Sequence, residues 1–166
     1  MGLWLAGLIA AWTGVGELPP CVAELFRVTR NTNANVVVYE ARLASPGVLD
    51  ERDPVHPVWL MLAEDGRREE LNLFEAAMAY GVEVRRGSAG EAVMVALRAK
   101  PDLDIRILLE KGCPVARTRI AGREATLGLV SVEASGGLLP QVVHVEMIGH
   151  DRASGAEVRE LLLPSE

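Results

Sequence analysis

Along most of the chain, apolar residues recur at every second position, which is the period of a β-strand with one buried face. Residues 104–110 show this most clearly, because Ile105, Ile107 and Leu109 fall on one side. Three further segments carry strand-like patterns: residues 91–98, 123–134 and 141–150. Glycine-containing turns separate these segments. Short, regularly spaced strands predict an all-β fold, namely an antiparallel β-barrel or β-sandwich of roughly eight to ten strands.

One segment departs from this pattern and predicts a short helix. Asn72 and Glu75 have the spacing of a capping box, in which each side chain bonds the other residue's backbone amide. The helix then covers about residues 73–80 and ends at Gly81, interpreted as a left-handed C-terminal residue. The helix face expected to cover an open end or face of the β-structure consists of Phe74, Ala77 and Met78.

The N-terminal segment differs from the rest, because it contains an apolar run without a charged side chain. This run is too short to span a bilayer but fits the apolar region of a secretory signal. Cys21 and Ala23 are small residues at the positions that a signal peptidase reads. We therefore expect a signal peptide over residues 1–23 and a single β-rich domain over residues 24–166, periplasmic or secreted, without a stable membrane span. A buried N-terminal helix and a start site further upstream are the alternatives.

The composition limits what kind of protein this is. The chain has 166 residues, of which 49% are hydrophobic and 24% charged, as in a globular domain with a real core. Aromatic residues make up only 4%, so the core must be mainly aliphatic. The formal charge of −6 argues against nucleic acid as a partner. Cleavage after Ala23 would leave Cys113 alone, whereas a retained Cys21 could pair with it.

Polar and aromatic residues around the predicted helix form the first candidate site. An opening in a β-barrel lined by amides and aromatic rings suits a small polar ligand. The expected ligand-binding residues are Asn33, Asn35, Trp59, Arg68, Glu75 and Tyr80, with Arg68 as an anion contact. All of them except Arg68 also have a structural interpretation, since asparagines tolerate turns, capping explains the glutamate, and the aromatic rings fill the core.

Two other pairs of polar residues are weaker candidates for a functional site. His144 and Glu146 share a strand face about 7 Å apart, but a third metal ligand is missing, so neither a metal nor a cofactor is expected. Arg117 and Arg119 also share a strand face. They could clamp an anion, or form ordinary cross-strand ion pairs, for which the candidate acids are Glu110 and Glu133.

Three segments carry a resemblance to a known family, namely residues 31–41, 54–59 and 70–81. Together they resemble the bacterial domain-of-unknown-function family 4833, over roughly the first half of the mature chain. The resemblance implies a small bacterial protein that is often exported, and it supplies no catalytic residues.

Three functions follow from these features. The leading expectation is a non-enzymatic module that binds a small polar ligand or another envelope protein. One alternative is an envelope hydrolase or isomerase that uses Glu75 and His144 as an acid–base pair. Another is a structural envelope protein that docks through an exposed strand edge.

Overall fold

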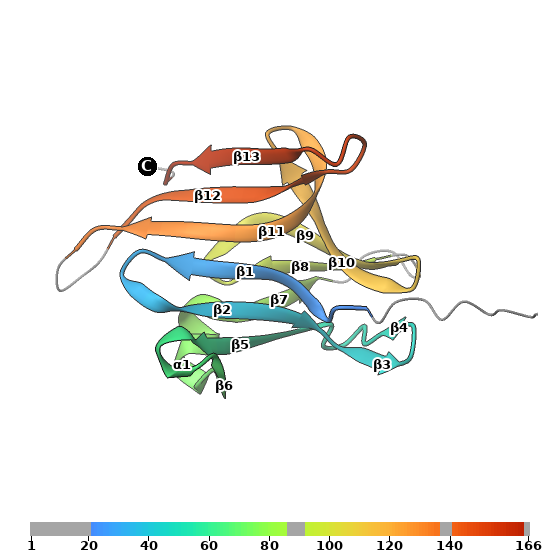
Figure 1. Ribbon diagram of the computed structural model, residues 1–166, viewed down its shortest axis with the longest axis horizontal. Helices are drawn as coiled ribbons and strands as arrows, with labels where there is room; N and C mark the ends of the chain where they lie inside the picture. Colours follow the sequence, from blue (N-terminus) through green and yellow to red (C-terminus); the bar gives the residue numbers. More distant parts are fainter. Residues whose placement is uncertain (1–20, 86–91, 137–140, 165–166) are drawn as a thin grey trace, which may run out of the picture.

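The computed structural model describes residues 21–85, 92–136 and 141–164, except for the side chain of Met78. The described parts are mainly β-strands with one short helical segment between strands (Figure 1). Most of the predicted signal peptide, residues 1–20, lies outside the described residues. Among the helices that are described, none is both long and apolar enough to cross a membrane.

In the described part of the chain, thirteen strands, one helical segment made of two consecutive elements and a separate three-residue 3₁₀ turn follow one another. The strands are β1 (Glu24–Arg30), β2 (Asn33–Ala41), β3 (Leu43–Ser45), β4 (Val48–Leu49), β5 (Val55–Met61), β6 (Arg67–Glu70), β7 (Val82–Arg85), β8 (Val93–Leu97), β9 (Lys100–Glu110), β10 (Cys113–Ile120), β11 (Arg123–Ala134), β12 (Val142–Asp151) and β13 (Glu157–Leu162). The helical elements are η1 (Leu62–Glu64), α1 (Leu73–Glu75) and η2 (Ala76–Tyr80).

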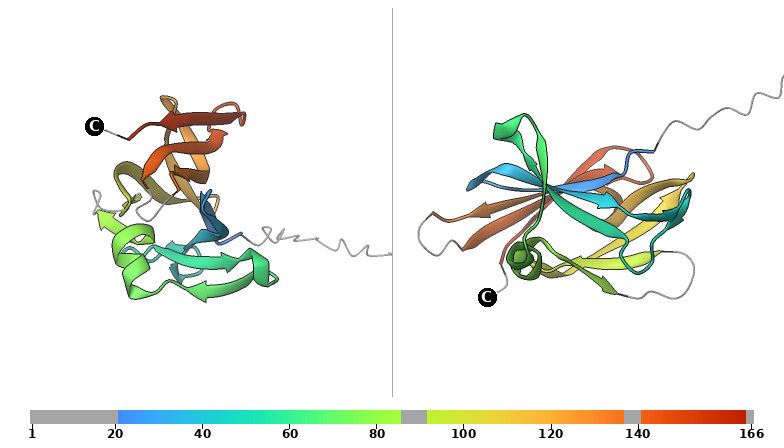
Figure 2. Two further views of the ribbon diagram at one scale, coloured as in Figure 1. Left: turned by 90° about the vertical axis from the view of Figure 1, so that its left-hand side faces the viewer. Right: turned by 90° about the horizontal axis from the view of Figure 1, so that it is seen from below.

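An eleven-stranded sheet divides into two wings at β11. The first part of β11 pairs with β10, as in the register of Arg117 with Thr126. The second part pairs with β1, as in the register of Arg27 with Leu129. We call β1, β2, β5 and β6 the β1 wing, and β10, β9, β8 and β7 the β10 wing. Strands β12 and β13 continue from the other side of β11, and α1 with η2 connects β6 to β7 (Figures 1 and 2).

The prediction of a mostly β fold with one short helix is confirmed, but a closed antiparallel barrel is wrong. The sheet is strongly curled and mixed, because β1 and β11 run parallel. It also holds more strands than expected, and β3 and β4 form a separate two-stranded sheet. A two-residue hydrophobic period indicates which side of a strand is buried. It carries no information on the direction of the neighbouring strand.

The core lies between the wings and is largely aliphatic, as the composition predicts. Ile105 and Ile107 are fully buried on the predicted shared face of β9. The aromatic exceptions sit on the β1 wing, where the rings of Phe26 and Tyr39 stack with centroids 4.5 Å apart. The hydroxyl of Tyr39 donates a hydrogen bond to the backbone carbonyl of Tyr80 over 2.8 Å. Burial raises the pKa of Tyr39, so this phenol stays neutral and keeps its proton.

The predicted capping box is present, but the predicted covering face is not. The Oδ1 atom of Asn72 accepts from the amide of Glu75 at 2.9 Å, and Glu75 Oε2 accepts from the amide of Asn72 at 3.0 Å. Phe74 is 73% exposed and Ala77 is also exposed, so their predicted covering role is wrong. The side chain of Met78 lies outside the described part. The helical segment turns its last residues, rather than this face, toward the interior.

Gly81 is needed for a reason other than the one predicted. Its φ of −67° and ψ of 161° are extended, so it is not a left-handed residue. A Cβ atom at this position would lie 1.8 Å from the carbonyl oxygen of Ala76, at the start of η2. The glycine is therefore required by close backbone approach.

Gly81→Ala is expected to lower the free energy of unfolding by about 3 kcal/mol, because the added methyl group forces the backbone apart. Urea denaturation followed by circular dichroism measures this. The matched control is Gly128→Ala, since a Cβ atom there would meet its nearest neighbour, the carbonyl oxygen of Ile148, at an ordinary 3.7 Å. Equal stabilities of the two variants would contradict the explanation.

Candidate functional site

Three of the predicted site residues come together beside the helix. The indole Nε1–H of Trp59 donates to Glu75 Oε2 over 3.1 Å. The rings of Trp59 and Tyr80 meet edge to face, with centroids 5.0 Å apart and planes inclined by 71°. Trp59 is only 8% exposed. These contacts dock the helical segment on the β1 wing and occupy the polar atoms that a ligand would use.

The other predicted residues have separate surroundings. Asn33 Oδ1 accepts from the amide of Asn35 at 2.9 Å, which is the bond of a turn that starts a strand. Asn35 Oδ1 is buried without a hydrogen-bond partner in the part of the chain that the structure describes. Arg68 forms an ion pair with Glu40. The ligand-binding role of the six residues stays a prediction.

The sequence did not predict the structural role of Asn31, which lies in the turn between β1 and β2, two residues before Asn33. Its Nδ2 group donates to Glu133 Oε1 at 2.8 Å and to the carbonyl of Ala134 at 3.0 Å. Its Oδ1 atom accepts from the amide of Ala134 at 2.9 Å. These bonds tie the turn between β1 and β2 to the end of β11, so Asn31 holds the parallel strand pair in register.

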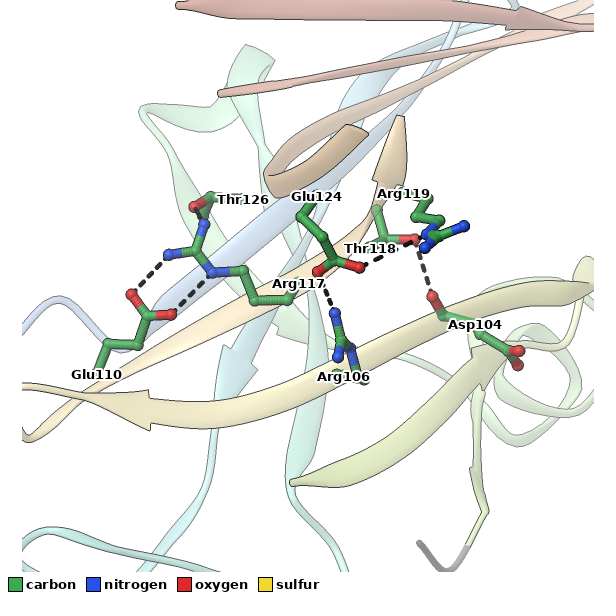
Figure 3. Close-up of polar contacts among 8 residues, drawn as sticks. All are labelled: Asp104, Arg106, Glu110, Arg117, Thr118, Arg119, Glu124 and Thr126. Carbon is green, nitrogen blue, oxygen red and sulfur yellow. Dashed lines mark hydrogen bonds and ion pairs between the residues drawn. The ribbon is translucent and has the colours of Figure 1, made fainter. Parts of the chain in front are cut away.

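The arginines of β10 form ion pairs with acidic residues of β9 and β11 (Figure 3). Arg117 binds both carboxylate oxygens of Glu110, at 3.0 and 2.6 Å, and also donates to Thr126. The hydrogen bond from Arg117 holds the pKa of Glu110 below its usual range. Arg119 lies 3.7 Å from Glu124. Structural pairing is thus confirmed for both arginines, whereas the other predicted acid, Glu133, is bound to Asn31.

The two residues of the predicted acid–base pair lie on different elements. Glu75 lies on α1, where its carboxylate serves Trp59 and the capping box. His144 lies on β12, in register with Glu133 of β11. Neither side chain lines the cavity described next. Within residues 21–85, 92–136 and 141–164, no three His, Cys, Asp or Glu side chains converge as metal ligands do.

A cavity of about 570 Å³ lies between the two wings. Both wings, η2 and strands β11 to β13 contribute to its walls. Its lining is mostly aliphatic: Val28, Ala79, Leu97, Ala99, Val130, Val132, Val142, Val145, Leu162 and Leu163, with Pro101 and Pro164. Tyr39 and Tyr80 add aromatic surface, and Tyr80 is the predicted site residue that reaches this cavity.

Two cationic side chains, Arg30 and Lys100, line the cavity, and they differ in whether an acidic residue neutralises them. Lys100 forms an ion pair with Asp102, and the hydrogen bond from Lys100 lowers the pKa of that carboxyl group. Arg30 has no ion-pair partner among the described residues, and its Nε atom is buried without a hydrogen bond. Arg30 follows Val28 by two residues, and in a strand this spacing places both side chains on the same, inner face. A charged residue on an inner face is unusual, so the sequence could have indicated Arg30 as a site residue.

Fold and cavity together define a mostly β protein with an apolar cavity between two wings of one curled sheet. The chain belongs to the family "Domain of unknown function (DUF4833)", whose family model matches residues 26–161. This confirms the resemblance found in the first half and extends it over most of the chain. Searches of curated proteins and of solved structures gave no match.

Proposed function

We propose that the protein is a non-enzymatic binding protein whose small ligand occupies the cavity between the wings. The observation that carries this proposal is the size and lining of the cavity. Its volume of about 570 Å³ falls in the range of roughly 300–1,000 Å³ that is usual for small-molecule sites. Because most of the lining is aliphatic, the body of the ligand is apolar rather than polar.

We also propose that the protein is exported to the periplasm or secreted. Support comes from the disulfide between Cys21 and Cys113, because disulfides persist in oxidising compartments. The apolar N-terminal run supports the same location. The predicted cleavage after Ala23 would remove Cys21. Because the disulfide needs this residue, we place the cleavage site on the N-terminal side of Cys21.

The binding proposal is tested with N-phenyl-1-naphthylamine, an uncharged apolar probe that fluoresces when it leaves water. We expect saturable binding to one site. Val132→Phe fills part of the cavity and should weaken binding by at least about tenfold, as overlap with the ligand forces the site apart. Val145→Phe does the same from β12 and serves if the first variant is poorly folded.

The matched control is Leu161→Phe, which adds the same ring to an exposed residue of β13 outside the cavity lining. It should leave probe affinity unchanged. The proposal fails if the wild-type protein gives no saturable signal, or if both cavity variants bind the probe as the wild type does.

A further inference from the structure

We infer that the ligand is an amphipathic anion, with one anionic head group bound by Arg30 and an apolar tail held between the wings. This inference rests on the proposed function, because it names the class of ligand that the cavity takes.

The position of Arg30 makes it the anchor. It is the last residue of β1 and lies in register with Asn33 on one side and with Val132 on the other. Val28 and Arg30 both line the cavity. Arg27, at the opposite parity of the same strand, is turned outward and paired with Glu24. The strand thus carries one ion-paired arginine outside and one arginine inside whose Nε atom has no partner among the described residues.

The charge balance of the cavity favours an anion. The buried Nε atom of Arg30 has lost its hydration, and nothing in the described residues replaces it. An anionic head group would supply an acceptor through a charge-assisted hydrogen bond. The neighbouring Lys100 is matched by Asp102, whose negative charge would repel a second anionic group. The cavity therefore favours a single anionic head group.

The remaining walls determine the other half of the ligand. They are aliphatic apart from the two tyrosines, and the hydroxyl of Tyr39 is already bonded to the carbonyl of Tyr80. A sugar or another polyhydroxylated ligand would bury hydroxyl groups without partners on these walls. An alkyl chain has no hydrogen bonds to lose on entering the cavity, and burying its apolar surface away from water is favourable.

The experiment is displacement of N-phenyl-1-naphthylamine by three compounds with the same ten-carbon tail: decanoate, decyl phosphate and decanol. At about pH 7.5 decanoate carries one negative charge and decyl phosphate between one and two, whereas the alcohol is neutral. We expect the better of the two anions to bind the wild-type protein about tenfold to a hundredfold more tightly than decanol. Guanidinium groups bind carboxylate and phosphate alike. The order of the two anions therefore tells whether the head group is that of a free fatty acid or of a phosphate-bearing lipid.

Arg30→Met should reduce this preference to about one while retaining decanol binding. Arg27→Met is the matched control, since it removes an arginine from the outer face of the same strand and should keep the full preference. If Arg30→Met is poorly folded, Arg30→Gln provides the same comparison with a polar side chain.

The inference is overturned if decanol binds the wild-type protein as tightly as both anions, or if the Arg30 variants keep the preference. In either case the probe still binds, so the proposed function stands. Absence of probe binding is a different result, which overturns the proposed function itself.

Discussion

Cys113→Ser is expected to lower the free energy of unfolding by about 4 kcal/mol relative to the oxidised protein. The disulfide joins Cys21, just before β1, to Cys113, the first residue of β10, across 92 positions of sequence. It therefore links the two wings directly. In the chain-entropy account, a cross-link over so long a loop removes much of the freedom of the unfolded chain. Urea denaturation at neutral pH measures the difference.

Two comparisons make this prediction specific. Cys21→Ser should lose as much stability as Cys113→Ser, and the double variant should lose no more, because both changes remove one bond. The reduced wild-type protein should resemble all three. Detection of two free thiols in the unreduced wild-type protein would contradict the prediction, as would a Cys21→Ser variant of wild-type stability.

Phe26→Ala is expected to cost about 4 kcal/mol of unfolding free energy. Phe26 is 1% exposed, stacks on Tyr39 and belongs to the core between the wings. Removing the ring leaves a void that the surrounding strands fill only partly, and the lost contacts add to the lost burial. Chemical and thermal denaturation of the variant measure the loss.

The chain supplies its own control for this change, because its only other phenylalanine is Phe74. That side chain is 73% exposed at the start of the helical segment. Phe74→Ala should change the free energy of unfolding by less than about 0.5 kcal/mol. Similar losses for the two variants would show that Phe74 is buried in solution or that Phe26 is not.

The features that the sequence predicted correctly are those fixed by near neighbours. The capping box between Asn72 and Glu75 spans three residues, and both of its bonds form. The alternation in β9 predicted the buried face of Ile105 and Ile107. The grouping of Trp59 with Glu75 was also predicted, since β5 and the helical segment are separated only by a hairpin.

The features that the sequence did not predict depend on contacts between distant segments. Arg30 lines one cavity together with aliphatic walls from its parallel neighbour β11 and from the turn between β8 and β9, which are far from it in sequence. No local pattern shows that such walls converge. Gly81 was misinterpreted because an ordinary helix end was assumed, whereas the π-helical turn brings the carbonyl of Ala76 against it.

The parallel pairing of β1 with β11 also determines when the fold can be completed. Arg27 of β1 pairs with Leu129 of β11. The first strand therefore lacks its parallel neighbour until about three quarters of the chain has been synthesised. Pairings between such distant segments form late and slowly, since a long loop must close first.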